Sequence, residues 1–296
     1  GVATVDGTKA TIELLDGILT LEGQTTYSGA AAAKLNGCLV TVSSYKRDYL
    51  TLSKVNGKGA STALNLTTNR MGTKELSAGA RFFEQVGNGR LVEIDRSDIT
   101  ITSIPANKIT YVGYDWAGRV DKLVLNDVTG DRYDYGIIHY QPAGYQETPG
   151  NPNGNGEYKN GEISVTNGSF PKGMPPYVVG SVDGAKTNRM GGVAGSLDQL
   201  DGKNRMAAFM PLNEATGIRR AQFDTDAMLL TTNSMVIPIS DKVECYNKTT
   251  GDWFKPGEDG DHKAALNLAL AFSDDITVYY DRSPEEGGKV RIVVVE

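Results

Sequence analysis

The chain has 296 residues, with 30 Lys plus Arg against 36 Asp plus Glu and a formal net charge of −6. This mildly acidic balance disfavours a general nucleic-acid binder, because such proteins need a basic face to neutralise phosphates. Only 2 His, 2 Cys and 2 Trp are present. Those counts nearly exclude metal sites and catalytic relays that are built from several imidazoles or thiolates.

Glycine and proline give the chain its general character, with 35 Gly and 11 Pro and no collagen-like period, so many turns are expected. No stretch approaches the roughly 20 consecutive apolar residues of a membrane helix, and we predict no membrane insertion. The first residues lack the basic and apolar regions of a signal peptide, and the chain begins without Met. We therefore expect a piece of a longer protein.

Short runs rich in Val, Ile, Thr and Tyr recur between clusters of Gly, Asn and Asp, which is typical of strands separated by turns. The predicted strands lie at 11–15, 38–43, 49–55, 91–94, 109–114, 120–125, 162–166, 177–179, 205–212, 227–232, 243–246, 276–280 and 290–295. This spacing indicates a mainly β protein, built from antiparallel sandwich-like or barrel-like modules rather than from parallel βαβ units.

Helical signal is confined to two short segments, 28–35 and 261–272, where Ser28 or Asp261 can act as an N-cap. The segment 141–160 is dense in Pro, Gly and Asn and has no periodicity, so it is the predicted linker. We expect one β module at 1–140 and a second at 161–296.

The sequence repeats itself, which favours two diverged copies of one module. The tetrapeptide Leu-Thr-Thr-Asn at 66–69 recurs at 230–233, and a Met follows each copy two positions later. Ordered matches further along the chain join Leu76-Ser77 with Ile239-Ser240, Phe82-Phe83 with Cys245-Tyr246, Ile109-Thr110 with Ile276-Thr277, and Tyr114-Asp115 with Tyr280-Asp281. Upstream, 48–57 pairs loosely with 205–217. Module 2 is therefore predicted to be a diverged repeat of module 1.

Each Tyr-Asp pair is followed by a glycine turn, at Gly118 or at Gly287-Gly288, and then by an apolar run. This pattern predicts a β-hairpin in which the Asp starts the turn and the Gly adopts positive φ. The second apolar run, 290–295, is apolar except for one Arg. We therefore expect it to be an inner strand that is covered on both faces.

Two acidic loops resemble cation sites only superficially. Asp127 to Asp131 spaces oxygen ligands at alternate positions, but Arg132 stands where a calcium loop needs its turn glycine. We expect a solvated turn there. Asp259 and Asp261 belong to a second cluster, which we expect to be a charged surface loop before a helix. Whether either loop binds a cation stays open at this stage.

No catalytic constellation is evident, and we predict no enzyme, no cofactor and no metal site. His139 and His262 have no triad partners at motif spacing. The glycines near 191–195 lack the Lys and the strand-to-helix context of a phosphate cradle. Cys38 and Cys245 are either two free thiols or one long-range bridge. Paired carboxylates of a glycoside hydrolase meet only in the fold, so a polysaccharide-active hydrolase stays a second alternative.

Aromatic residues are the best candidates for a binding surface. The 14 Tyr lie largely in or beside predicted strands, where structural use is the default. Trp116 and Trp253 occur in turn-like contexts, Asp-Trp-Ala-Gly and Gly-Asp-Trp-Phe. If exposed, either ring can act as a platform for a ligand or a partner.

Two regions of the sequence resemble a known group of proteins. The first comprises 104–115 (IPANKITYVGYD), 118–125 (GRVDKLVL), 127–131 (DVTGD) and Tyr133-x-Tyr135-Gly136. The second comprises 237–240 (IPIS), 243–246 (VECY), 247–254 (NKTTGDWF), 276–281 (ITVYYD) and 286–291 (EGGKVR). Together they resemble segments of the large surface proteins of clostridia-like Firmicutes that carry S-layer homology domains.

The resemblance implies an extracellular segment of a cell-wall-associated or S-layer-associated protein, outside the repeats that anchor such proteins. No anchoring repeat is recognisable here, and the family segment has no assigned reaction or functional residues to transfer. We therefore expect a non-catalytic structural or interaction segment whose partners are cell-wall glycan or other surface proteins. The alternative is a glycan-binding module that uses exposed aromatic residues.

Overall fold

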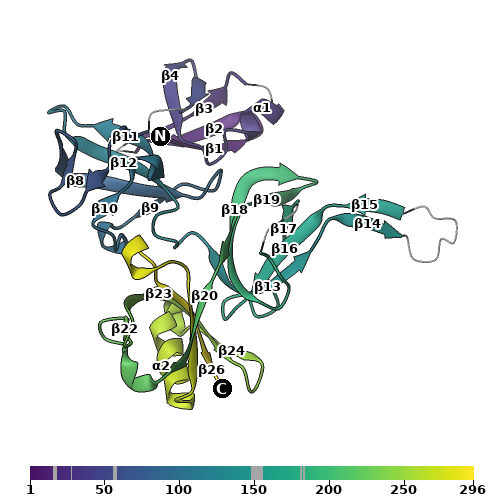
Figure 1. The fold of residues 1–296 in the computed structure, drawn as a ribbon. Coiled ribbons are helices and arrows are strands. Elements are labelled where there is room, and N and C mark those ends of the chain that lie inside the picture. The colour runs from purple at the N-terminus through teal and green to yellow at the C-terminus, as the bar shows by residue number, and fades with distance from the viewer. Residues whose placement is uncertain (16–18, 28, 56–58, 148–155, 181, 183) are drawn as a thin grey trace. The chain divides into compact units, whose positions relative to one another are not determined.

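The computed structural model describes residues 1–296 except 16–18, 28, 56–58, 148–155, 181 and 183. As predicted, the protein is mainly β, with two short α-helices in the described part of the chain. The chain divides into two compact units (Figure 1). Unit 1 comprises residues 1–128 with 196–198, and unit 2 comprises 129–195 with 199–296.

Unit 1 begins with a five-stranded sheet in the order β1-β2-β3-β5-β4. Its strands are β1 (Val2–Asp6), β2 (Lys9–Glu13), β3 (Thr20–Thr25), β4 (Val40–Lys46) and β5 (Tyr49–Lys54). Only β3 and β5 pair in parallel. A β-bridge between Val2 and Leu39 joins β1 to the residue that precedes β4. Helix α1 (Gly29–Ala33) is shorter than the predicted 28–35, whose first residue, Ser28, lies outside the described residues.

The second sheet of unit 1 has the order β10-β6-β7-β8-β12-β11, and β9 also pairs with β8. Its strands are β6 (Leu64–Asn65), β7 (Arg70–Met71), β8 (Lys74–Gln85), β9 (Val92–Ile94), β10 (Ser103–Ile104), β11 (Ile109–Tyr114) and β12 (Val120–Asn126). The 3-10 helices η1 (Arg96–Asp98) and η2 (Ala106–Lys108) flank β10. Leu64, Phe82, Leu123 and Leu125 are buried in its core.

Unit 2 begins with a closed barrel in the order β13-β16-β17-β19-β18. Its strands are β13 (Asp134–Gln141), β16 (Gly161–Thr166), β17 (Tyr177–Val179), β18 (Met190–Leu200) and β19 (Lys203–Pro211). Between β13 and β16, β14 (Gly144–Glu147) and β15 (Gly156–Lys159) form a separate hairpin that projects from the barrel (Figure 1). This hairpin occupies much of the predicted linker, 141–160, of which 148–155 lie outside the described residues.

The second sheet of unit 2 has the order β20-β25-β26-β23-β22-β21, and β24 also pairs with β23. Its strands are β20 (Asn213–Ile218), β21 (Phe223–Asp224), β22 (Leu229–Thr231), β23 (Val236–Asn247), β24 (Asp252–Phe254), β25 (Ile276–Tyr280) and β26 (Val290–Val295). The 3-10 helices η3 (Arg220–Gln222), η4 (Glu258–Gly260) and η5 (Pro284–Glu286) lie in its connections.

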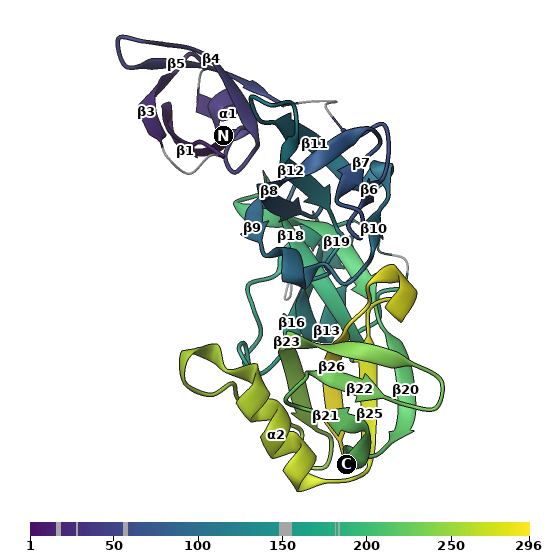
Figure 2. The ribbon, with the colours of Figure 1, turned by 90° about the vertical axis from the view of Figure 1, so that its left-hand side faces the viewer.

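Helix α2 (His262–Phe272) covers one face of that sheet (Figure 2). It forms where 261–272 was predicted, and the Asp261 carboxylate caps it by accepting the Ala264 N–H at 3.2 Å. Leu266, Ala269 and Leu270 pack against the apolar residues of the sheet. In the described residues, no helix has the length and apolarity that crossing a bilayer requires.

The two units share most of their strand order. They differ in their second sheets, where β10 pairs with β6 in unit 1 and β20 pairs with β25 in unit 2. The orders β1-β2-β3-β5-β4 and β13-β16-β17-β19-β18 are the same, with the parallel pair at the same place. In the second sheets, β12 runs parallel to β8 as β26 runs parallel to β23. A duplication would produce such shared strand orders, and it stays a prediction. The strand pairings also show that neighbouring strands in each unit are not all antiparallel, whereas the sequence predicts antiparallel modules.

The parallel ladders of the two units both contain a register shift. In unit 1 the β12–β8 ladder shifts between Val120, which faces Leu76, and Lys122, which faces Arg81. In unit 2 the ladder shifts between Val290, which faces Ile239, and Ile292, which faces Glu244. The same irregularity thus occurs at matched positions. The glycines also match, since Gly118 has φ +76° and Gly287 has φ +80°, as the predicted hairpins require.

β26 is the inner strand that its sequence predicts. It pairs with β23 on one edge and β25 on the other, and none of its residues is more than 4% exposed. The chain returns to it through a tight loop, in which Gly288 approaches another segment closely. A Cβ added at Gly288 would lie 1.8 Å from the carbonyl oxygen of Arg282.

We predict that Gly288→Ala destabilises the protein by roughly 1 to 3 kcal/mol, because the backbone of the loop must move to accept a methyl group. Gly79→Ala is the control, since nothing lies within 4 Å of the Cβ that it adds. Urea unfolding measures both. Equal midpoints for the two variants would contradict the close approach at Gly288.

Candidate functional site

The tip of the β11–β12 hairpin in unit 1 is a turn that Asp115 holds in place. One carboxylate oxygen of Asp115 accepts the N–H groups of Ala117 and Arg119, both at 2.9 Å, and the other accepts Arg119 Nε at 2.8 Å. The hydrogen bond from the Arg119 backbone is the main cause of a lowered pKa of Asp115. The turn is therefore fixed by several hydrogen bonds from one side chain.

This turn presents Trp116, one of the two predicted platform residues, to solvent. The Trp116 side chain is 97% exposed, and neighbouring Tyr114 is 52% exposed. Lys74 Nζ lies 5.9 Å from the centre of the Tyr114 ring, within the range of a cation–π interaction. An indole held on a preformed turn loses little freedom when it binds a partner.

Trp253, the other predicted platform residue, lies in β24 of unit 2 and is half-buried. Its ring centre is 4.9 Å from that of Tyr246, and the two planes are tilted by 50°. The Trp253 ring thus packs against another aromatic ring. The two tryptophans belong to different units.

The segment after β12 differs from the predicted solvated turn, and that prediction was wrong. Val128, Thr129 and Gly130 are buried, and the Asp131 side chain is only 13% exposed. Val128 packs in the apolar core of unit 1, and Asp131 is held by an ionic cluster in unit 2. The described residues contain no group of three or more His, Cys, Asp or Glu side chains placed to hold a metal ion.

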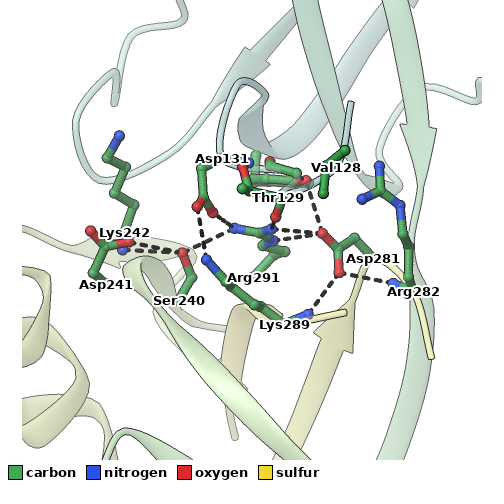
Figure 3. Close-up of polar contacts among 12 residues, drawn as sticks. Val128, Thr129, Asp131, Ser240, Asp241, Lys242, Asp281, Arg282, Lys289 and Arg291 are labelled. Carbon is green, nitrogen blue, oxygen red and sulfur yellow. Dashed lines mark hydrogen bonds and ion pairs between the residues drawn. The ribbon is translucent and has the colours of Figure 1, made fainter. Parts of the chain in front are cut away.

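Arg291 is at the centre of this cluster (Figure 3). It stands in β26 and is 1% exposed. Its guanidinium bonds to Asp281 Oδ2 at 2.7 and 2.9 Å and to Asp131 Oδ1 at 2.5 Å. It also donates to Ser240 Oγ at 3.1 Å and to the Thr129 carbonyl at 2.5 Å. Each guanidinium nitrogen therefore has an acceptor, which a buried arginine needs.

Lys289 and Tyr135 complete the cluster. Lys289 Nζ lies 2.8 Å from Asp131 Oδ2, and the Arg291 guanidinium lies 5.0 Å from the centre of the Tyr135 ring. Burial opposes ionisation of Asp131, but the charges of Arg291 and Lys289 hold its pKa below the usual value. The cluster ties residues 129–131, where unit 2 begins, to its last strand.

A small cavity of about 110 Å³ lies beside the cluster, and the carboxyls of Asp134 and Glu244 line it together with His262. Glu244 Oε2 accepts the Gly168 N–H at 2.8 Å, and Oε1 lies 3.9 Å from His262 Nδ1. Nδ1 also lies 3.1 Å from the Val243 carbonyl. Because a carbonyl only accepts, Nδ1 carries the hydrogen in this arrangement.

Burial governs the titration of these groups. It raises the pKa of Glu244 to about 7, against the lowering effect of the Gly168 hydrogen bond. It also raises the pKa of Asp134 and lowers the pKa of His262. Both carboxyls thus retain protons to higher pH than usual. Raised carboxyl pKa values also occur in active sites, but this cavity is well below the roughly 300 Å³ at which ligand sites begin.

Comparison with protein-family models, with curated proteins and with solved structures found no match. The resemblance to S-layer-associated proteins therefore stays a prediction. Trp116 was predicted from its sequence context, whereas the Arg291 cluster was not. The available signal was a single cation inside an otherwise apolar strand.

We predict that Arg291→Met destabilises unit 2 by about 3 to 5 kcal/mol, because it leaves the buried carboxylates of Asp131 and Asp281 without their main counter-charge. Lys203→Met is the matched control. It breaks an ion pair with Glu162 whose side chains are 48% and 38% exposed, and it is expected to cost at most about 1 kcal/mol. Denaturant unfolding followed by circular dichroism separates the two. Equal losses of unfolding free energy in the two variants would show that the buried cluster stabilises unit 2 no more than a surface ion pair does.

We predict that Glu244 makes the stability of the folded protein depend on pH. The Glu244 pKa of about 7 in the folded state exceeds its ordinary 4.5. The stability that the protonated carboxyl contributes is therefore complete below pH 4.5 and is lost as pH rises through 7. Glu244→Gln removes this loss while an amide oxygen still accepts the Gly168 N–H. The variant should gain roughly 3 kcal/mol relative to wild type between pH 4.5 and 8.

The measurement is the free energy of unfolding of both proteins across that pH range. His262 has a lowered pKa, so its contribution is lost as pH falls and has the opposite sign. Because Glu244 Oε1 lies 3.9 Å from His262 Nδ1, the comparison is repeated in a His262→Gln background, which removes the His262 contribution, and Glu258→Gln is an exposed control. If the difference in unfolding free energy between wild type and Glu244→Gln stays constant with pH, the raised pKa of Glu244 is contradicted.

Proposed function

We propose that the chain is a non-catalytic interaction segment of an extracellular, cell-wall-associated protein, and that Trp116 is its principal contact. The observation that carries the proposal is the 97% exposure of this indole on a turn fixed by Asp115. Tryptophan is enriched among the residues that dominate binding energy at interfaces. A preformed turn reduces the entropic cost of docking such a residue.

The wall-associated location is supported by the likeness of 104–136 and 237–291 to segments of S-layer homology proteins. The partner is then wall glycan or another surface protein. The net charge of −6 suits a protein that stays dispersed at high local density.

Glycan recognition through Trp116 is the second candidate function. It is favoured by the neighbouring Tyr114, which is 52% exposed and lies under the Lys74 ammonium. Aromatic faces carry partial negative charge, which attracts the C–H groups on the face of a sugar ring. A polysaccharide hydrolase is less well supported, because the cavity lined by Asp134 and Glu244 measures only about 110 Å³.

We predict that Trp116→Ala weakens retention of the protein on isolated clostridial cell walls by at least about tenfold, the loss expected for an interface tryptophan. Since the side chain is almost fully exposed, stability should change by no more than about 0.5 kcal/mol. A sedimentation assay with washed walls measures binding.

Tyr49→Ala is the matched control, because Tyr49 is a 55% exposed aromatic residue elsewhere in unit 1. Protease-treated walls separate the two kinds of partner: retention that survives treatment indicates glycan, and retention that is lost indicates a surface protein. Failure of the wild-type chain to bind intact walls, or equal binding by Trp116→Ala, would contradict the proposal.

A further inference from the structure

The second sheet of unit 2 has one face that α2 leaves uncovered. Val278, Val293 and Cys245 point into the core that α2 covers. Because side chains alternate along a strand, Thr277, Val294 and Tyr246 point to the other face. These three residues face one another across β25, β26 and β23, and they line a groove of about 970 Å³ within unit 2.

The barrel of unit 2 supplies the opposite wall of this groove. Ile137, Met190, Phe209 and Pro211 contribute apolar surface that is at least partly exposed. With Tyr246 and Tyr279 from the sheet, three aromatic rings line the groove, and each is half-buried. Trp253 packs against Tyr246 at 4.9 Å between ring centres, which restricts the orientation of that ring.

The charged side chains around the groove include more cations than anions. Lys248 is paired with Glu296, and Glu214 is hydrogen-bonded to the Tyr279 side chain. Lys186 and Arg189 are exposed and make no ion pair with any of the described residues. Two exposed cations without an ion-pair partner among the described residues therefore lie beside the aromatic rings. Glu214 keeps its negative charge, so the side chains that line the groove carry one net positive charge, in a chain whose net charge is −6.

We propose that this groove binds an anionic polysaccharide, with Tyr246, Tyr279 and Phe209 against sugar rings and Lys186 and Arg189 on the acidic groups. This inference deepens the proposed wall association, on which it rests, by naming a ligand class. It uses a surface of unit 2, whereas Trp116 belongs to unit 1.

The sheet geometry favours a polysaccharide over an extended peptide. Peptides that join a sheet pair with the free backbone groups of an edge strand. Of the strands of this sheet that line the groove, β25, β26 and β23 each have neighbours on both sides, so their backbone groups are occupied. β20, which contributes Glu214 and Thr216, is the one edge strand among them. What they offer is a face of aromatic rings and hydroxyls, which suits sugar rings.

The test uses polygalacturonate, a chain of uronic acids, as the probe in isothermal titration calorimetry with the full chain. We expect saturable binding that weakens when salt is raised to about 0.5 M. The double variant Lys186→Gln/Arg189→Gln should bind roughly tenfold more weakly, since it loses two charge contacts. The same polymer with its carboxylates methyl-esterified should bind as weakly to wild type.

Lys172→Gln/Arg205→Gln is the matched control, because both residues are exposed cations of unit 2 outside the groove. Tyr279→Ala tests the aromatic contribution, with circular dichroism to show that it folds. The proposal is overturned if polygalacturonate does not bind, if the groove and control variants bind equally, or if the methyl ester or polyglutamate of equal charge binds as well.

Wall binding separates this inference from the proposed function. Retention on walls that needs Trp116 but is unchanged in the Lys186→Gln/Arg189→Gln variant would leave the proposed function standing and overturn the groove. The reverse pattern, in which the groove variant alone loses retention, would support the groove and overturn the role of Trp116.

Discussion

In each unit the closing strand of the second sheet runs parallel to the long strand that precedes it, and much of the fold follows from this pairing. A parallel pair needs a crossover connection of a dozen or more residues. In unit 1 that connection carries β9, β10 and β11, and in unit 2 it carries β24, α2 and β25. The closing strand ends inside the sheet, so its residues must suit burial. The exception in β26 is Arg291, which is stable there because Asp131 and Asp281 supply two carboxylates.

The tips of the β11–β12 and β25–β26 hairpins are built around matched aspartates but present different surfaces. Asp115 and Asp281 occupy matched positions, and both accept a backbone N–H from across their turns, from Arg119 and Lys289. In unit 2 the aspartate is buried and also binds Arg291. In unit 1 the side-chain partner is the exposed Arg119, and the turn holds Trp116 in solvent. The framework thus explains why Trp116 is both exposed and fixed, which is the basis of the proposed interaction.

Sequence patterns predicted the positions of the strands better than the pairing between strands. Every predicted strand overlaps an observed one, because runs such as 276–280 and 290–295 combine β-branched residues with flanking turns. β8 and β18 were missed, since Gly, Ala and charged residues dominate much of both. Their strand conformation depends on neighbours in the sheet. The Arg291 cluster was also missed, because Asp131 and Arg291 are 160 positions apart and nothing local indicates that they meet. Trp116 was found because its turn is local: Asp115 and Gly118 specify it.

The central functional claim is that the Trp116 indole contacts the cell wall. The chain has only two tryptophans, so a nitrogen-15 NMR spectrum contains two indole N–H signals, which Trp116→Ala assigns. Solubilised wall fragments are then titrated into the labelled protein. We expect the Trp116 signal to shift or broaden saturably, while the Trp253 signal separately reports any change at Tyr246 beside it. A Trp116 signal that stays unchanged while wall fragments bind elsewhere on the protein would contradict the account.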